Sequence, residues 1–400
     1  MFGLDFFSKF FGDSLASART TTKFINIQSS GMSVWNGSAY ENDIYRSAVD
    51  AIARNAAKLK GVHVITNAEY RKPAQEMRIN RLLQITPNEF MNSYDLLYKL
   101  ITRYFISNNS FAVLSWNERG LLEGIYPIDY VHVEMQIDEK GNLYSEFQFR
   151  NGKRIKFLYR DVIHLRRHFN KNELLGDDNR ALDPAIELAA TQNEGLVNSI
   201  KSGASIRGIL KFTQIMAKSQ LKEAKDAFIE DYLSLNNEGG IVATDQKMEY
   251  QPIENKPVIL NAEQIKLIQE KIYNYLGISE KIVNSSYSED EYSAFYESTI
   301  EPIATQLSLE FTRKIFSERE IAFGNEIIFE SGRLQFSSNQ TKINLIKELI
   351  PYGLLSINQA MEILNLPPVE NGDRRLQTLN VIESDRATEY QLKKAGNKDD

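Results

Sequence analysis

The sequence predicts an α+β protein of more than one domain, on the basis of three patterns. Apolar residues recur at helical spacing over 41–60 and again over 292–317, which predicts two amphipathic helices. Between them, residues 110–165 alternate apolar and polar side chains and are broken by turns at 138–141 and 151–152, which predicts an antiparallel meander. At 400 residues, the chain is long enough for two or three domains with cores of their own.

Helix start and stop signals place the next two helices. One helix is expected from about Ser93, because Pro87 blocks the continuation of the helix before it. Another is expected to start at Asp183-Pro184, with aspartate as the N-cap and proline as the first helical residue, and to end near Ser202.

A compact insert and a further helix follow. Residues 205–258 contain a strand-like run, a helical run and two more strand-like runs, which predicts a small β-α-β insert. Residues 261–276 place apolar side chains on one stripe and Glu263, Glu270 and Asn274 on the opposite face. This pattern predicts an amphipathic helix with one polar surface.

The last third of the chain contains the longest helical pattern. Pro302 lies inside it, so a kink is expected at that point. A strand at 326–336 and a helix at 340–350 come next. Ser356-Ile357-Asn358-Gln359 has the form of a capping box and is expected to open a final helix.

Composition limits the classes of function. Lys and Arg total 47 against 53 Asp and Glu, a net charge of −6, whereas a protein that grips nucleic acid needs a basic surplus or stripe. The chain has no cysteine, which excludes disulfides, thiolate metal sites and cysteine nucleophiles. No apolar run approaches the roughly 18 residues of a membrane span, and no membrane partner is expected.

Motifs for catalysis are absent from the sequence. There is no phosphate-binding loop, dinucleotide fingerprint or nucleophile elbow. His164 and His168 have a metal-like spacing, but in a strand these positions lie about 13 Å apart, so a strand end with solvated basic side chains is the favoured interpretation. The acids at 289–291 could chelate a divalent cation, although a solvated acidic loop is favoured. We therefore predict no catalytic residues, no metal site, no cofactor and no enzymatic activity.

The first twelve residues, MFGLDFFSKFFG, contain five phenylalanines. They lack the basic start and long apolar core of a secretory signal. A short amphipathic segment on a membrane is one interpretation, and packing against a neighbouring subunit or the body of the protein is the favoured one. Residues 13–40 are rich in Ser, Thr, Asn and Gly and are expected to form an extended arm.

Short motifs occur in a fixed order from about residue 41 to 380. They are AVDAIARNAAKL (48–59), LL with PN (82–88), NSFA (109–112), YPID (126–129), DVIH (161–164), STIEP (298–302), and the Gly353, Asn358, LPP (366–368), GD (372–373) series. In this order the chain resembles the portal, or head-to-tail connector, proteins of tailed bacteriophages, in the siphophage and prophage branch. It departs from them at Asn108, where glycine is usual and asparagine tolerates a left-handed backbone, and at Ser279, where proline is usual.

The resemblance implies a portal-type fold that assembles into a ring. The implied divisions are an N-terminal arm (1–40), the N-terminal part of the wing (41–180), a stem helix (181–204), the clip (205–258), a second stem helix (259–276), the tunnel loop (277–291), the rest of the wing with the long kinked helix and a strand (292–339), and the helical crown with the C-terminal tail (340–400).

The resemblance also implies a function. Portal proteins form rings, of twelve subunits in the virion, at one capsid vertex, and DNA passes through the ring during packaging and ejection. The implied partners are further copies of the chain, the terminase large subunit, the major capsid protein and scaffold, head–tail adaptor proteins, and double-stranded DNA in transit without sequence preference. The implied location is the virion, after assembly in the cytoplasm of the host bacterium.

Particular residues take roles under this resemblance. The channel-lining stem residues are Glu263, Glu270 and Asn274, and the terminase-facing clip residues are Lys218, Lys222, Lys225 and Asp226. The tunnel-loop residues expected to touch DNA are Asn284, Ser285, Ser286, Tyr287, Ser288, Glu289, Asp290 and Glu291. Residues 279–301 contain six acids and one lysine, a local charge of −5, and an acidic lining would repel phosphates and let the duplex slide.

Three alternatives stay open at the level of the sequence. The acidic loop could be an ordinary solvated surface loop. The chain could be a phage minor capsid or adaptor protein without a DNA channel. A metal-dependent hydrolase using the carboxylate cluster with His164 and His168 is the third and least favoured alternative.

Overall fold

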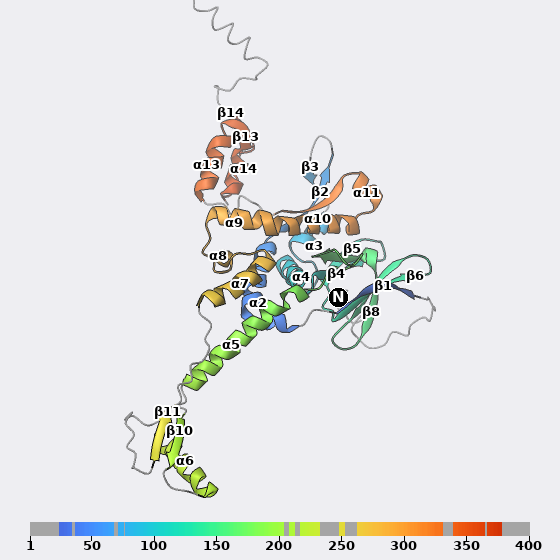
Figure 1. The fold of residues 1–400 in the computed structure, drawn as a ribbon. Helices are drawn as coiled ribbons and strands as arrows, with labels where there is room; N and C mark the ends of the chain where they lie inside the picture. Colours follow the sequence, from blue (N-terminus) through green and yellow to red (C-terminus); the bar gives the residue numbers. More distant parts are fainter. Residues whose placement is uncertain are drawn as a thin grey trace, which may run out of the picture. The chain divides into compact units, whose positions relative to one another are not determined.

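The computed structural model describes residues 24–33, 37–67, 71–75, 77–203, 208–212, 217–232, 248–252, 262–330, 339–364 and 366–377. The chain divides into two compact units (Figure 1). The first unit contains residues 1–34, 49–178 and 280–400, and the second contains residues 35–48 and 179–279. Helix α2 (Asp43–Ala56) begins in the second unit and ends in the first. The helix expected over 41–60 is thereby confirmed.

Three sheets of three or four strands lie in the first unit. One has the order β12-β2-β3, with β2 at Lys60–Thr66, β3 at Arg71–Pro73 and β12 at Asn325–Glu330. The second has the order β5-β4-β9, with β4 at Asn109–Trp116, β5 at Leu122–Pro127 and β9 at Val162–Arg166. The third has the order β1-β6-β7-β8, with bounds Phe24–Ser33, His132–Asp138, Leu143–Gln148 and Arg154–Leu158.

The single meander expected over 110–165 is wrong. Its strands divide between two sheets, because β5 does not pair with β6: β4 and β5 form a sheet with β9, whereas β6 pairs with β1 and β7. The edge of β6 that faces away from β7 pairs with β1. Part of the expected N-terminal arm is therefore an extended strand. The Phe-rich residues 1–12 lie outside the described residues.

One cluster in the core of the first unit is built around three aromatic rings. Phe111, Tyr130 and Phe147 are at most 2% exposed and meet edge to face, with ring centroids 5.0 to 5.7 Å apart. Such edge-to-face pairs add to the hydrophobic stabilisation of the buried rings. This cluster joins the β5-β4-β9 sheet to the β1-β6-β7-β8 sheet.

Helices α3 (Met77–Gln84) and α4 (Ser93–Ser107) precede the second sheet. Asn92 caps α4 through a capping box with Asp95. At the other end, Asn108 has φ 54°, a left-handed conformation that asparagine tolerates, and its Nδ2 donates to the Asp177 carbonyl at 2.7 Å. The replacement of the usual glycine by Asn108 thus preserves the turn.

The long helix begins earlier than expected and is interrupted. It consists of α9 (Glu289–Phe295), a π-helical turn (Tyr296–Ile300) and α10 (Glu301–Ile315). The Glu301 N–H donates to the Tyr296 carbonyl, five residues back. Proline has no N–H to continue the helical ladder, so the distortion expected at Pro302 falls in the turn before it. The short helices α8 (Glu280–Val283) and α11 (Glu318–Ala322) flank this element.

The C-terminal part contains α13 (Asn339–Leu349), β13 (Tyr352–Ser356), α14 (Ile357–Ile363) and β14 (Arg375–Gln377). The capping box of Ser356 and Gln359 at the start of α14 is confirmed. The antiparallel pair β13-β14 was not expected from the sequence. The strand expected over 326–336 is confirmed as far as Glu330, and the remainder lies outside the described residues.

The second unit contains α5 (Asp183–Gly203) and α7 (Ala262–Leu276), which pack together. The Tyr275 hydroxyl donates to Asn179 Oδ1 at 2.8 Å, just before a 3₁₀ turn at Arg180–Leu182. Asp183 itself has helical dihedral angles, so its expected role as a non-helical N-cap is wrong, because the 3₁₀ turn leads directly into α5.

The insert in the second unit consists of β10 (Gly208–Phe212), α6 (Lys218–Tyr232) and β11 (Met248–Pro252), with β10 and β11 antiparallel. The strand-like run at 239–245 lies outside the described residues. Within the part of the chain that the structure describes, no helix combines the length and the hydropathy that a membrane span requires.

Candidate functional site

The acidic segment 284–291 is helical at its end. The whole of 277–291 was expected to be a loop, and this is wrong: Ile282 is buried within α8, and Glu289 opens α9. Ser288 is the N-cap of α9, accepting from the Glu291 N–H at 3.3 Å, and the Ser288 N–H donates to Glu291 Oε2 at 2.8 Å. Ser285, in the turn between α8 and α9, has φ 57°.

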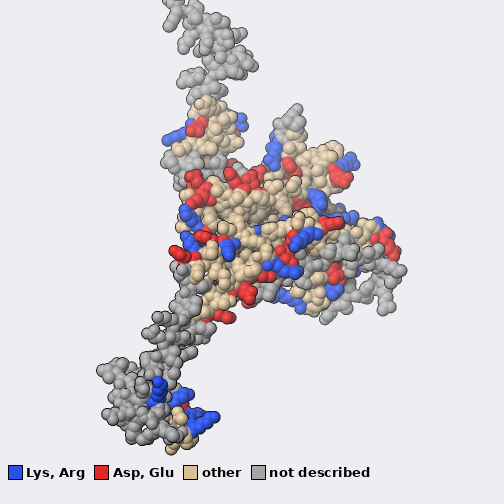
Figure 2. All heavy atoms as spheres, in the orientation of Figure 1, with Lys and Arg blue, Asp and Glu red and all other residues tan. Residues whose placement is uncertain are grey.

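The three acids occupy the first turn of α9. Carboxylates there are stabilised by the partial positive charge of the helix N-terminus. Glu291 also pairs with Lys281, and the hydrogen bond from Lys281 lowers the pKa of Glu291. Glu289 and Asp290 are exposed, and acidic side chains gather over α9 on the face shown in Figure 2. Glu289 and Asp290 therefore present negative charge to solvent, whereas Glu291 caps the N-terminus of α9.

Two tyrosines hold this segment to the body of the first unit. Tyr287 stacks on Tyr292 with ring centroids 5.2 Å apart, and the Tyr292 hydroxyl donates to Asn55 Oδ1 at 3.3 Å. Burial raises the pKa of Tyr292 to about 12, so its hydroxyl stays protonated at neutral pH. Asn284 and Ser286, which precede these two tyrosines, are exposed, and so is Tyr287 itself.

The predicted channel-lining residues lie on one face of α7 in the second unit. Glu263, Glu270 and Asn274 are exposed, whereas Ile268 and Ile272 are at most 3% exposed. This confirms the amphipathic pattern of the helix. The polar surface is not purely acidic, because Lys266 and Lys271 are exposed as well. Lys266 pairs with Glu270 at 4.0 Å.

The predicted clip residues all lie on α6. Lys218, Lys222, Lys225 and Asp226 are exposed, and Lys225 pairs with Asp226 at 3.6 Å. The face is dominated by lysine and is suited to an acidic partner surface.

The interpretation of His164 as a solvated strand end is wrong. His164 is 2% exposed, stacks on Phe111 with ring centroids 4.1 Å apart, and bonds through both ring nitrogens. Nε2 is 3.0 Å from Asn109 Oδ1, and Nδ1 is 3.0 Å from the Tyr159 hydroxyl. Burial and neighbouring cations hold the pKa of His164 well below its ordinary value. It is a structural histidine whose ring partners come from two other elements, Asn109 of β4 and Tyr159 five residues before it.

The structure does not support a metal site at His164 and His168. His164 has no ring nitrogen left for a metal, since both are hydrogen-bonded. His168 lies beyond the end of β9 with φ 50°. Among the described residues, no group of three or more histidines and carboxylates is arranged to hold a metal ion.

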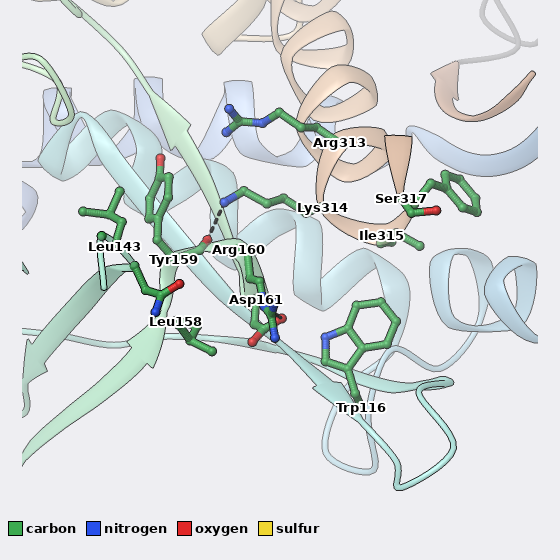
Figure 3. Close-up of a pocket in the computed structure, with 13 residues that line it drawn as sticks. Trp116, Leu143, Leu158, Tyr159, Arg160, Asp161, Arg313, Lys314, Ile315 and Ser317 are labelled. Carbon is green, nitrogen blue, oxygen red and sulfur yellow. Dashed lines mark hydrogen bonds and ion pairs between the residues drawn. The ribbon is translucent and has the colours of Figure 1, made fainter. Parts of the chain in front are cut away.

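The sequence did not reveal one feature of the first unit, a pocket of about 660 Å³ (Figure 3). Its walls include Trp116, Leu143 and Phe316, and its cations are Arg160, Arg313 and Lys314. We name it the wing pocket. The ends of β4, β8 and α10 meet the β6–β7 turn at this pocket. Because these elements are distant in the sequence, no local sequence pattern predicts it.

Lys314 is the most buried of the three cations of the wing pocket. It donates to the Tyr159 carbonyl (Figure 3), its Nζ lies 3.8 Å from the centre of the Tyr159 ring, and Glu310 is 3.9 Å away. Burial lowers the pKa of Lys314 to about 8, because Glu310 only partly offsets the lost hydration.

Comparisons with known proteins identify the family. The family model described as "Phage portal protein" matches residues 43–365. "Probable portal protein" sequences of Lactococcus phages p2 and SK1 are each 25% identical over 258 residues, covering 60% of this chain and 65% of the relative. The chain therefore spans somewhat less than two thirds of the curated relatives that it matches.

Solved structures show the same fold. The neck of an empty gene transfer agent particle, computed with C6 symmetry, gives a TM-score of 0.58 at 16% identity and covers 86% of this chain and 97% of that one. An HK97-family phage portal protein from Corynebacterium diphtheriae gives a TM-score of 0.51 at 11% identity, covering 77% of this chain and 100% of that one. Because the family model matches most of the chain and runs through both units, the chain belongs to the phage portal protein family.

Proposed function

We propose that this chain is the subunit of a closed portal ring at one vertex of a phage capsid, and that DNA passes through the ring during packaging and ejection. The observation that carries the proposal is the family match over residues 43–365. A structural neighbour, the neck of a native gene transfer agent particle, was computed with C12 symmetry, which favours twelve subunits here as well. Closed cyclic rings need two different surfaces on each subunit that meet head to tail.

The exposed acids of the first unit are suited to a channel that must not bind its cargo. Glu289 and Asp290 present negative charge at the start of α9, and like charges keep the DNA backbone from adhering. We assign 284–291 to the segment that meets DNA, with Glu291 as a structural cap within it. In the stem, we assign Glu263, Glu270 and Asn274 to the channel surface. Lys266, which pairs with Glu270, reduces the negative charge there.

The lysine-rich face of α6 is our candidate for the docking surface of the terminase large subunit and the head–tail adaptors. Lys218, Lys222 and Lys225 are all exposed on it. The major capsid protein and scaffold are the remaining expected partners. The ring would be built in the cytoplasm of the host bacterium and retained in the virion. No role in this account requires a catalytic residue, so we propose a non-enzymatic function.

The proposal is tested by deleting the gene from its phage or prophage and supplying the chain in trans. We expect capsids assembled without it to contain no nuclease-protected genome, and protection to return when the chain is supplied. A phage that fills its capsids equally well in its absence would show that the chain is not the DNA conduit.

A further inference from the structure

The wing pocket combines aromatic walls with exposed cations. Trp116 and Phe316 supply aromatic walls, while Arg160 and Arg313 supply positive charge at side chains that are 81% and 56% exposed. Its volume of about 660 Å³ lies in the range of pockets that hold drug-sized ligands. A pocket of this kind suits an aromatic side chain next to a carboxylate, since aromatic contact area and a guanidinium–carboxylate pair would be satisfied together.

The cations of the pocket differ in how readily they can bind an incoming carboxylate. Lys314 is 5% exposed at its side chain and already bonds Tyr159 and Glu310. Arg160, whose side chain is 81% exposed, pairs at 3.8 Å with Asp161, a pocket residue whose side chain is 30% exposed, and a pair with one partner so exposed contributes little. Arg160 can therefore turn to an incoming carboxylate at small cost.

The rim of the pocket is held rigid by the turn between β6 and β7. Asp138 Oδ1 accepts from the Asn142 N–H at 2.7 Å, and Asp138 Oδ2 accepts from Asn142 Nδ2 at 2.9 Å. Asn142 and Gly141 line the pocket directly. A rim that is already ordered loses little conformational entropy when a segment binds against it.

The chain's own N-terminal segment starts from this rim. Strand β1 runs antiparallel to β6, and its first residue, Phe24, pairs with Asp138. The first residue of β1 therefore lies at the β6–β7 turn, whose residues Gly141 and Asn142 line the pocket. Sixteen residues lie between Phe7 and Phe24, and these seventeen Cα–Cα steps can extend to roughly 55 Å, so the chain before Phe24 is long enough for residues 4–7 to reach the pocket.

The sequence of this segment matches the pocket. Residues 4–7 are Leu-Asp-Phe-Phe, which place a carboxylate directly before two aromatic side chains. We propose that residues 4–7 of the chain dock in the wing pocket of the same chain. Phe6 and Phe7 pack against the Trp116 and Phe316 walls, and Asp5 pairs with Arg160. This docking would fix the segment against the β1-β6-β7-β8 sheet. This inference does not depend on the portal function.

The absence of cysteine makes a direct test possible. In the full chain, Phe6→Cys is combined with Asn142→Cys at the pocket rim, and the matched control combines Phe6→Cys with Asn151→Cys, an exposed residue in the turn at the other end of the same sheet. After mild oxidation, we expect at least a fivefold higher yield of an intrachain disulfide for the rim pair, mapped by mass spectrometry of peptides. Equal yields in the two variants, or links only between chains, would overturn the proposal.

A second measurement does not rely on the rim substitution. In a Trp35→Phe background, Trp116 is the only tryptophan and reports on the pocket. We expect Phe6→Ala with Phe7→Ala to shift Trp116 emission to longer wavelength and to raise its quenching by acrylamide, because the indole becomes wetter. Phe10→Ala with Phe11→Ala, which lack a neighbouring carboxylate, should leave both unchanged. No change with the first pair, or the same change with both pairs, would contradict docking of residues 4–7.

Discussion

Gln306 and Arg166 exchange two hydrogen bonds. The Arg166 N–H donates to Gln306 Oε1 at 3.2 Å, and Gln306 Nε2 donates to the Arg166 carbonyl at 2.8 Å. One turn later on α10, Glu310 Oε1 accepts from the His164 N–H at 3.2 Å. The side chains of α10 thus take the place of a neighbouring strand along the free edge of β9, which protects the edge from pairing with another chain.

Loss of Gln306 should destabilise the first unit. Gln306→Ala leaves a backbone donor and an acceptor of Arg166 without their partner, which costs about 1–3 kcal/mol in free energy of unfolding when the groups remain away from water. Urea denaturation followed by circular dichroism measures the change. A variant as stable as the parent would show that water replaces the glutamine without cost.

Ser308 and Thr312 of α10 seal the edge of β12, and the Phe329 N–H donates to Ser308 Oγ at 2.8 Å. Thr312 tests this role. Its hydroxyl accepts from the Ile327 N–H at 2.8 Å and donates to the Ile327 carbonyl at 3.2 Å. Thr312→Val keeps the volume and removes both bonds, so we expect a loss of about 1–2 kcal/mol. Thr305→Val, at an exposed position of the same helix, is the matched control and should change stability by less than about 0.5 kcal/mol. Equal effects in the two variants would refute the edge-sealing role.

His164 should make stability depend on pH. Its pKa in the folded chain is well below the ordinary value, so the unfolded chain takes up a proton near pH 6.5 while the folded chain does not. Stability is therefore complete above about pH 6.5 and falls as pH drops, by up to about 1.4 kcal/mol per unit from this group. His164→Gln should flatten the dependence between pH 6.5 and 5, measured as the unfolding midpoint at each pH. An unchanged slope would show that other groups set it.

Local signals in the sequence predicted much of the fold. The capping box at Ser356 and the helix at 262–276 depend on neighbouring residues alone, and both are found. The distortion before Pro302 also follows from chemistry within one turn. The start of α9 was missed although Ser288-Glu289-Asp290-Glu291 has the same capping-box form, because the density of acids was interpreted as a loop.

Long-range contacts explain what the sequence did not predict. His164 is buried because Asn109, Tyr159 and Glu310 converge on it from three elements. The split of the meander goes with two long-range pairings, of β9 with β4 across some fifty residues and of β6 with β1, which no period-two pattern specifies. The wing pocket is assembled from the ends of separate strands and a helix, so it could be found only in the folded chain.

The acids at the start of α9 should matter for DNA passage and not for folding. Glu289 and Glu318 each directly follow a serine N-cap, Ser288 and Ser317, and both are exposed. We expect Glu289→Lys to leave the assembly intact and to lower the yield of packaged DNA several-fold, because a cation at the channel surface would hold the backbone. Glu318→Lys is the matched control and should package normally. Normal packaging by Glu289→Lys would remove 284–291 from the channel.

The central claim is that the chain closes into a ring with a passage through it. The purified protein is examined by native mass spectrometry together with negative-stain images viewed down the ring axis. We predict closed rings with cyclic symmetry and a central channel, and a mass of roughly 550 kDa for twelve subunits of 45.8 kDa each. A single population of monomers or dimers at every protein concentration would contradict the account.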